Sequence, residues 1–134
     1  MNRDIELLRL RPEIPSARVS EKMSLEEHFQ NKTLRPVIKL QNELFVEVFR
    51  NYIKKHKNSF HSYSVEKKLS FIENAIQRDI KFRNSLKGIV MGQFTVEEYL
   101  LYIENSSALN KRMMNILKER MFSNIQLLEQ EMAY

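Results

Sequence analysis

The chain has 134 residues and contains no cysteine, only two glycines and three prolines. Without cysteine it can form no disulfide, no thiolate nucleophile and no cysteine-ligated zinc or iron–sulfur centre. Hairpins and tight turns need residues that accept a positive φ, so a β-rich fold would be short of glycine. The composition therefore predicts an all-α fold.

Long hydrophobic runs are also missing. The longest uncharged stretch covers residues 88–96, whereas about 20 residues are needed to cross a bilayer. The first twelve residues, MNRDIELLRLRP, alternate charged with aliphatic side chains and lack the apolar core of a signal peptide. With 43% hydrophobic and 29% charged residues, we expect one globular domain in the cytoplasm.

The two ends of the chain differ in their predicted structure. Residues 1–23 are expected to form an extended N-terminal arm, because Pro12 and Pro15 bias their neighbours toward extended backbone. Any helix over Ile5–Leu10 would be short. Residues 24–134 are expected to form a single helical bundle domain of four to five helices.

Apolar side chains three and four positions apart locate the helices of this domain. We expect them over residues 24–30, 33–56, 65–91, 96–105 and 107–132. Ser24 and Ser64 are suitable N-caps. The NSS sequence before Ala108 indicates either a break with Ser107 as N-cap or a kink in one continuous helix, and the break is favoured.

Both glycines lie in the stretch GIVMGQFTVEEY, residues 88–99. Gly92 is expected to close a helix in the left-handed conformation, which costs glycine little. Thr95 and Glu98 have the spacing of a capping box that starts the next helix. Gly88 falls inside a helix, where glycine costs about 1 kcal/mol relative to alanine, so a neighbouring helix is expected to approach it closely.

The sequence offers no recognisable catalytic or metal-binding motif. The three histidines occur in no Glu-x-x-His or His-Glu-x-x-His pattern. No serine has the context of a known nucleophile, and the two glycines do not form a phosphate-binding loop. Asp79 and Arg83 are expected to form an ion pair on the surface of a helix. We therefore predict no catalytic, cofactor-binding or metal-binding residue.

Positive charge is concentrated in the middle of the chain, where residues 50–87 hold ten lysines and arginines but three acids. Lysines neutralise phosphates and aromatic rings stack on bases, so the segment 54–68, with Phe60 and Tyr63, is a candidate nucleic-acid contact. The alternative is a solvated turn whose aromatic side chains pack on the bundle. The candidate nucleic-acid-binding residues are Lys54, Lys55, Lys57, Lys67 and Lys68.

Two segments carry a family resemblance: TLRPVIKLQNELFVEVFRNYIKKHKNSF, residues 33–60, and GQFTVEEYLLYIENSSALNKRMMN, residues 92–115. The chain, from about Arg11 onward, resembles a small bacterial family of short helical proteins, some of which are labelled glyoxalase. That label implies a metal-dependent lyase acting on a glutathione hemithioacetal, with histidine, glutamine and glutamate ligands on strands. No strand and no matching motif is predicted here, so no ligand residue is transferred.

Three functional hypotheses follow. The first is a non-enzymatic cytoplasmic module for protein interaction or self-association, supported by apolar helix faces and the N-terminal arm. The second is a basic helical protein that associates with nucleic acid or the ribosome through residues 54–68. The third is the glyoxalase-like lyase that the resemblance implies. Whether the protein is an enzyme is left open.

Overall fold

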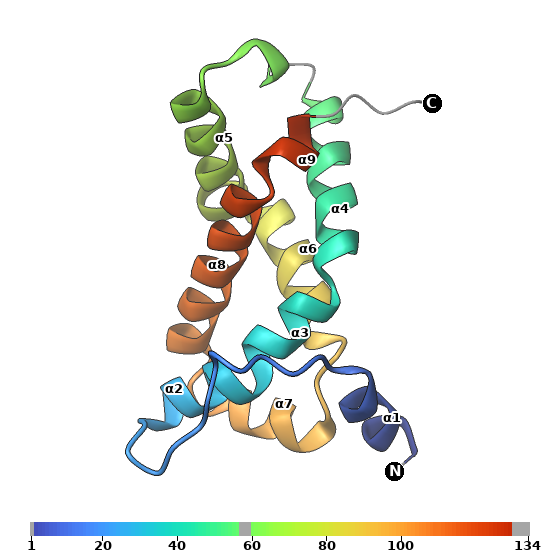
Figure 1. Cartoon of the computed structure of the whole chain (residues 1–134), viewed down its shortest axis with the longest axis vertical. Helices are drawn as coiled ribbons and strands as arrows, with labels where there is room; N and C mark the ends of the chain where they lie inside the picture. Colours follow the sequence, from blue (N-terminus) through green and yellow to red (C-terminus); the bar gives the residue numbers. More distant parts are fainter. Residues whose placement is uncertain (1, 57–59, 130–134) are drawn as a thin grey trace.

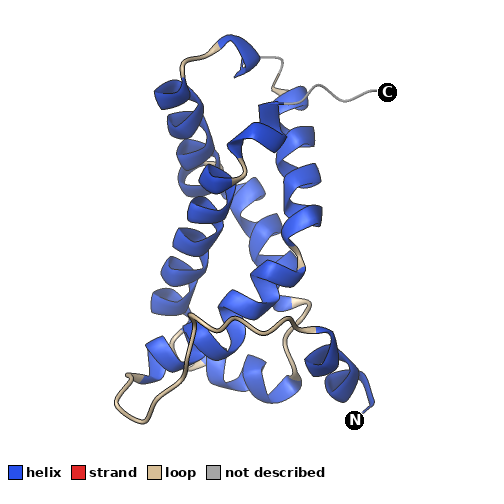
Figure 2. Ribbon diagram, viewed as in Figure 1, coloured by secondary structure: helices blue, strands red, loops and turns tan. Residues whose placement is uncertain are grey.

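The computed structural model describes residues 2–56 and 60–129, and all regular structure within them is helical (Figures 1 and 2). The predicted all-α class is confirmed for these residues. A π-helical turn η1 (Gln30–Leu34) joins two of the helices, and a 3-10 turn η2 (Phe60–Ser62) precedes another. The α-helices are α1 (Asn2–Leu10), α2 (Leu25–Phe29), α3 (Arg35–Leu40), α4 (Asn42–Lys55), α5 (Val65–Arg78), α6 (Ile80–Met91), α7 (Val96–Ile103), α8 (Ser106–Ser123) and α9 (Ile125–Glu129).

The molecule is elongated, and α4, α5 and α8 run along its long axis (Figure 1). Helices α2, α3 and α7 close one end, where α1 also lies, and α9 packs on α4 toward the other end. Among the described helices, none is long and apolar enough to cross a membrane. The core between the helices is made by fully buried aliphatic, aromatic and methionine side chains, including Leu34, Ile38, Phe45, Phe49, Ile72, Ile76, Leu86, Met113, Leu117 and Met121.

The predicted N-caps Ser24, Ser64 and Thr95 are confirmed, because each side chain accepts a hydrogen bond from the backbone N–H three residues later. The predicted break between the last two long helices is also confirmed. It falls slightly earlier than expected, because α8 begins at Ser106 and its N-cap is Asn105. The single helix predicted over residues 107–132 is wrong, because Asn124 (φ −100°, ψ 16°) separates α8 from α9.

The predicted start of a helix at Thr33 is wrong. Helices α2 and α3 form one helical run through η1, and Thr33 is buried inside that π turn. Pro36 near the start of α3 has no N–H to donate and would crowd the carbonyl four residues before it. The π turn before it changes the hydrogen bonding, with the Arg35 N–H bonded to the Gln30 carbonyl five residues back.

The helix predicted over residues 33–56 is also interrupted at Gln41, whose backbone (φ −90°, ψ 7°) separates α3 from α4. This joint changes which side chains of α4 face the core. Phe45 and Phe49 are buried, whereas Leu44, which belongs to the apolar pattern of the sequence, is 48% exposed.

The single helix predicted over residues 65–91 is wrong as well, because Asp79 divides it into α5 and α6. Asp79 has extended backbone (φ −86°, ψ 97°), and its Oδ1 accepts a hydrogen bond from the Phe82 N–H at 3.1 Å. Aspartate is favoured at such an N-cap. Its Oδ2 accepts from the Tyr52 hydroxyl at 2.9 Å, so within the described residues the predicted ion pair with Arg83 does not form. Ile80, an apolar residue within the single helix predicted here, is 72% exposed.

Helix α6 does end directly before Gly92, as predicted. The predicted left-handed conformation of Gly92 and the predicted close approach of a helix to Gly88 are both wrong. Gly92 is right-handed (φ −61°, ψ −17°), and α6 instead ends through i to i+3 hydrogen bonds, from the Gln93 N–H to the Val90 carbonyl and from the Phe94 N–H to the Met91 carbonyl. Gly88 is exposed, and a Cβ built on it meets no atom within 4 Å. No neighbouring helix therefore requires glycine at position 88.

Candidate protein-interaction surface

The position of α7 is fixed by the carboxylate of Glu98. Its oxygens accept hydrogen bonds from both terminal nitrogens of Arg11, each at 2.6 Å. The Thr33 hydroxyl donates to Oε2 at 2.6 Å and the Thr95 N–H to Oε1 at 2.8 Å, while Thr95 in turn caps α7. The capping box predicted from the sequence is therefore confirmed, and it also joins α7 to η1 and to the residue that follows α1.

The electrostatics of this cluster show that Glu98 is ionised. Burial raises the pKa of the Glu98 carboxyl, but hydrogen bonds from Arg11, Thr33 and the Thr95 N–H, together with the charge of Arg11, lower it below its ordinary 4.5. Each of its oxygens accepts two hydrogen bonds from these groups. A carboxylate that is buried and saturated in this way holds the structure together.

Helix α1 is attached to the same region by polar contacts. Arg3 donates to the Gly92 carbonyl at 3.1 Å, and the Asp4 carboxylate accepts from the Val96 N–H at 3.2 Å. The extended arm predicted over residues 1–23 is not confirmed, because Asn2–Leu10 form helix α1. None of the described side chains of α1 is buried. Its apolar residues therefore stay at the surface.

The solvent side of α7 is apolar. Val96, Tyr99, Leu100 and Ile103 follow one another at i, i+3, i+4 and i+7, so they lie on one face of the helix. Their exposed fractions run from 47% for Tyr99 to 55% for Leu100. The residues that hold α7 on the protein, such as Glu98, lie on the other side. An amphipathic surface helix normally turns mainly polar residues to water, whereas most of the exposed residues of α7 are apolar.

A hollow of about 320 Å³ continues this surface between α2 and the start of α8. Its apolar wall includes Phe29 and Leu101, and Leu25 at its edge is 91% exposed. Glu26 and Glu104 also line it. The hollow therefore combines apolar walls with two carboxylates.

Exposed apolar side chains gather at this end of the molecule. Of the fourteen large hydrophobic side chains that are exposed among the described residues, nine belong to α1, α2 and α7. Exposed apolar side chains that gather on one part of a protein often mark an interaction site. We call the set the apolar end, and its members are Ile5, Leu8, Leu10, Leu25, Val96, Tyr99, Leu100, Leu101 and Ile103.

The charges along α2 and α7 are mainly acidic, although the chain carries a net charge of +5 and α1 balances two arginines against two acids. Helix α7 contains no lysine or arginine. Its exposed acid is Glu97, and Glu104 directly follows the helix. Glu26 and Glu27 contribute further carboxylates from α2. The apolar end is therefore complementary to a basic, apolar surface.

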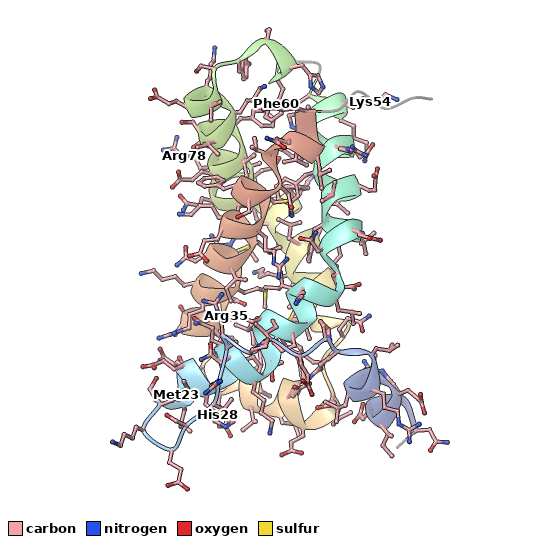
Figure 3. The ribbon with its side chains drawn as sticks, viewed as in Figure 1. Met23, His28, Arg35, Lys54, Phe60 and Arg78 are labelled. Carbon is pink, nitrogen blue, oxygen red and sulfur yellow. The ribbon has the colours of Figure 1, made fainter. Side chains whose placement is uncertain are left out.

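The five predicted nucleic-acid-binding lysines have different environments. Lys54 and Lys55 are exposed at the end of α4 (Figure 3), and Lys57 lies outside the described residues. The Lys67 ammonium lies 4.2 Å from the ring centroid of Tyr63. Lys68 is only 7% exposed, and its Nζ lies 3.1 Å from a Glu129 carboxylate oxygen. It would have to leave this ion pair before it could contact a phosphate.

The aromatic residues of the same segment pack inward. Phe60 is fully buried and contacts the ring of Phe71 edge-on, with the centroids 5.4 Å apart. Tyr63 is partly buried against the core. Their placement agrees with the alternative reading of the segment, in which its aromatic side chains pack on the bundle.

Another polar cluster lies between α4 and the joint of α5 and α6. The Tyr52 hydroxyl bonds to Asp79, and His56 Nε2 lies 4.0 Å from the same carboxylate. Burial, the hydrogen bond to Asp79 and the negative charge of Asp79 raise the pKa of Tyr52 to about 12. A phenol with this pKa stays protonated at neutral pH, so it serves as a hydrogen-bond donor that ties α4 to α6.

The described residues do not fit the metal that a glyoxalase-like lyase would require. In residues 2–56 and 60–129, no three or more His, Cys, Asp or Glu side chains are grouped so that they could hold a metal ion. No catalytic step through a metal is therefore derived for this chain.

The chain matches no protein-family model, no curated protein and no solved structure. The family resemblance and the three functional hypotheses therefore stay predictions.

Sequence reasoning missed the exposed stripe of α7 and the role of Arg11. The stripe has a signal in the sequence, because VEEYLLYI places apolar residues around most of the helix. The role of Arg11 has no local signal in the sequence, because its partner Glu98 is 87 residues away in the chain.

Proposed function

We propose that the chain is a protein-interaction module whose apolar end docks a partner protein with an apolar groove edged by lysine or arginine. The observation that carries this proposal is the exposed stripe of Val96, Tyr99, Leu100 and Ile103 on α7. Side chains at i, i+3, i+4 and i+7 are the anchors by which a groove recognises a helix. The cluster around Glu98 supports the proposal by holding this helix rigidly in place.

Burial of the exposed apolar side chains of α7 by a partner would provide binding free energy. Fully burying one aliphatic or aromatic side chain of this size stabilises a complex by about 1.5–3 kcal/mol. Because the four anchors are already about half buried, each would gain roughly 1 kcal/mol more. The remaining members of the apolar end would add to this gain, which must offset the loss of freedom on association.

The charges argue for a basic partner and against a second copy of the chain. If two α7 helices packed face to face, Glu97 and Glu104 of both copies would come close together, and like charges oppose such a contact. A partner with lysine or arginine around its groove would instead be attracted to these carboxylates. We therefore assign the surface to a different, basic protein.

The test uses the double variant Leu100→Ser/Ile103→Ser and a matched control, Val65→Ser/Ile80→Ser, which removes two exposed aliphatic side chains elsewhere. Wild type and both variants capture proteins from nuclease-treated lysate of the native host, and the captured partner is then purified. We expect the α7 variant to bind that partner at least tenfold more weakly, and the control to bind it like wild type.

Equal loss of binding in both double variants would contradict the proposal. The same holds if sedimentation shows that wild type forms a dimer that the α7 variant cannot form, because the occupant would then be a second copy. Thermal unfolding of both variants shows whether either has lost its fold, and the control also removes two exposed aliphatic side chains.

A nucleic-acid contact is the second candidate, favoured by the exposed Lys54 and Lys55 at the end of α4. A second capture without nuclease separates the nucleic-acid contact from the protein partner. Proteins that are held only through bridging nucleic acid are captured without nuclease and are lost when nuclease is added. If this candidate holds, binding of an RNA or DNA oligonucleotide falls steeply with salt and is lost in Lys54→Glu/Lys55→Glu. Binding that is insensitive to salt, or retained in this variant, contradicts it.

A further inference from the structure

A polar hollow of about 540 Å³ lies where the loop after α1 crosses η1 and α8. Its walls include Ser16 from the loop, Gln30 and Asn31 from η1, and the arginines Arg35 and Arg120. An adjoining hollow of about 210 Å³ is lined by the same two arginines. Figure 3 labels Arg35 where the loop crosses the bundle in that view. The larger volume lies within the range of small-molecule sites.

Arg35 and Arg120 are both partly buried, yet neither guanidinium has a hydrogen bond or an ion pair within the described part of the chain. Other arginines of this protein do have carboxylate partners, as Arg11 has Glu98 and Arg50 has Glu47. A guanidinium carries a permanent positive charge in proteins. The partial burial of two such charges without an acidic partner costs free energy.

The polar groups that line the two hollows do not neutralise the positive charges of Arg35 and Arg120. Among the described residues, no aspartate or glutamate lines the larger hollow. Glu119 lines the smaller one, is exposed and forms no ion pair with either arginine among the described contacts. Gln30 accepts from Arg112 through Oε1, and Asn31 donates to the Arg18 carbonyl. These bonds fix both amides in the wall.

We propose that this hollow binds a small molecule through a phosphate or carboxylate group held between Arg35 and Arg120. A guanidinium offers parallel N–H donors that match the oxygens of either group, and such charge-assisted hydrogen bonds are short and strong. Two cations that line one hollow repel each other, and an oxyanion between them removes that repulsion. The polar lining selects a polar ligand. This site is separate from the apolar end and does not depend on the proposed function.

Calorimetric titration of the full chain with inorganic pyrophosphate, and separately with citrate, tests the site at constant ionic strength. We expect saturable binding of at least one of them with one site per chain, and the better probe shows whether phosphate or carboxylate is the ligand group. Arg35→Gln and Arg120→Gln should each weaken binding by roughly tenfold or more. The matched control is Arg83→Gln, which removes another partly buried arginine without a described partner and away from both hollows.

Glu119→Gln provides an independent readout, because Glu119 lines the smaller hollow beside the arginines and removal of its carboxylate should strengthen binding. The proposal is overturned if neither probe binds saturably. It is also overturned if Arg83→Gln weakens binding as much as Arg35→Gln, or if Glu119→Gln leaves the affinity unchanged. Should Arg35→Gln fail to fold, Arg120→Gln and Glu119→Gln still decide the question.

Discussion

Arg11 and Glu98 are 87 residues apart in the chain and form a two-pronged ion pair, with both nitrogen–oxygen distances at 2.6 Å. Their side chains are almost completely buried. The pair connects the segment that follows α1 to the first turn of α7. The N-terminal residues are therefore part of the structure that holds the apolar end in place.

Replacement of Arg11 by methionine should destabilise the protein strongly. The substitution leaves the Glu98 carboxylate buried without its cation, and breaking a buried pair in this way typically costs about 3–5 kcal/mol. Arg9→Met is the matched control, because its ion pair with Glu6 is exposed and should contribute less than about 1 kcal/mol. Urea denaturation measures both changes. Similar free energies of unfolding for the two variants would show that the buried pair does not stabilise the domain.

The stability that Glu98 provides should depend on pH. Its pKa in the folded protein is below the ordinary 4.5, so its contribution is complete above about pH 4.5 and is lost as the pH falls through the lower folded value. The free energies of unfolding of wild type and Glu98→Gln should therefore differ most near neutral pH and converge in acid. A difference that stays constant down to the acid transition would contradict the assignment.

Tyr52 should ionise later than an ordinary tyrosine. Its pKa is raised from the ordinary 10.0 to about 12. Its contribution to stability is therefore present below pH 10.0 and is lost as the pH rises through about 12. Absorbance titration of the phenols, compared with Tyr52→Phe, isolates this group. In Asp79→Asn, which keeps a good N-cap, the pKa of Tyr52 should fall because the hydrogen bond to a charged acceptor is lost. An unchanged pKa would indicate that burial alone causes the shift.

Gly88→Ala should stabilise the protein by about 0.5–1 kcal/mol, since alanine is favoured over glycine inside a helix and the new Cβ meets open space. Gly92→Ala should gain less, because its Cβ would lie 3.2 Å from the Gly88 carbonyl oxygen. Thermal and urea unfolding of the two variants give the comparison. A loss of stability in Gly88→Ala would mean that a neighbour does approach this position.

Local signals predicted much of the fold. Ser24, Ser64 and the pair Thr95 and Glu98 were identified as helix starts because their side chains bond to backbone N–H groups three residues away. Gln41 and Asp79 were missed because apolar residues continue on both sides of them, so the periodicity hides a break. At Asp79 the partner is Tyr52 on another helix, which no local pattern reveals.

The candidate surfaces were less predictable. Lys68 was grouped with the surface lysines by its place in the sequence, yet it is buried beside Glu129 from the far end of the chain. The hollow with Arg35 and Arg120 also depends on contacts between distant segments. The solvent exposure of a side chain depends on how distant segments pack together. A single sequence predicts this exposure only where the amphipathic pattern of a helix is regular.

The most direct test of the interaction surface is site-specific photo-crosslinking in the native host, with a photoreactive phenylalanine analogue at position 100 or, as a control, at position 65. Leu100 and Val65 are similarly exposed but lie on different helices. The proposal predicts a discrete protein adduct from position 100 and none from position 65. No adduct from position 100, or the same adducts from both positions, would contradict the claim that the exposed face of α7 binds a partner protein.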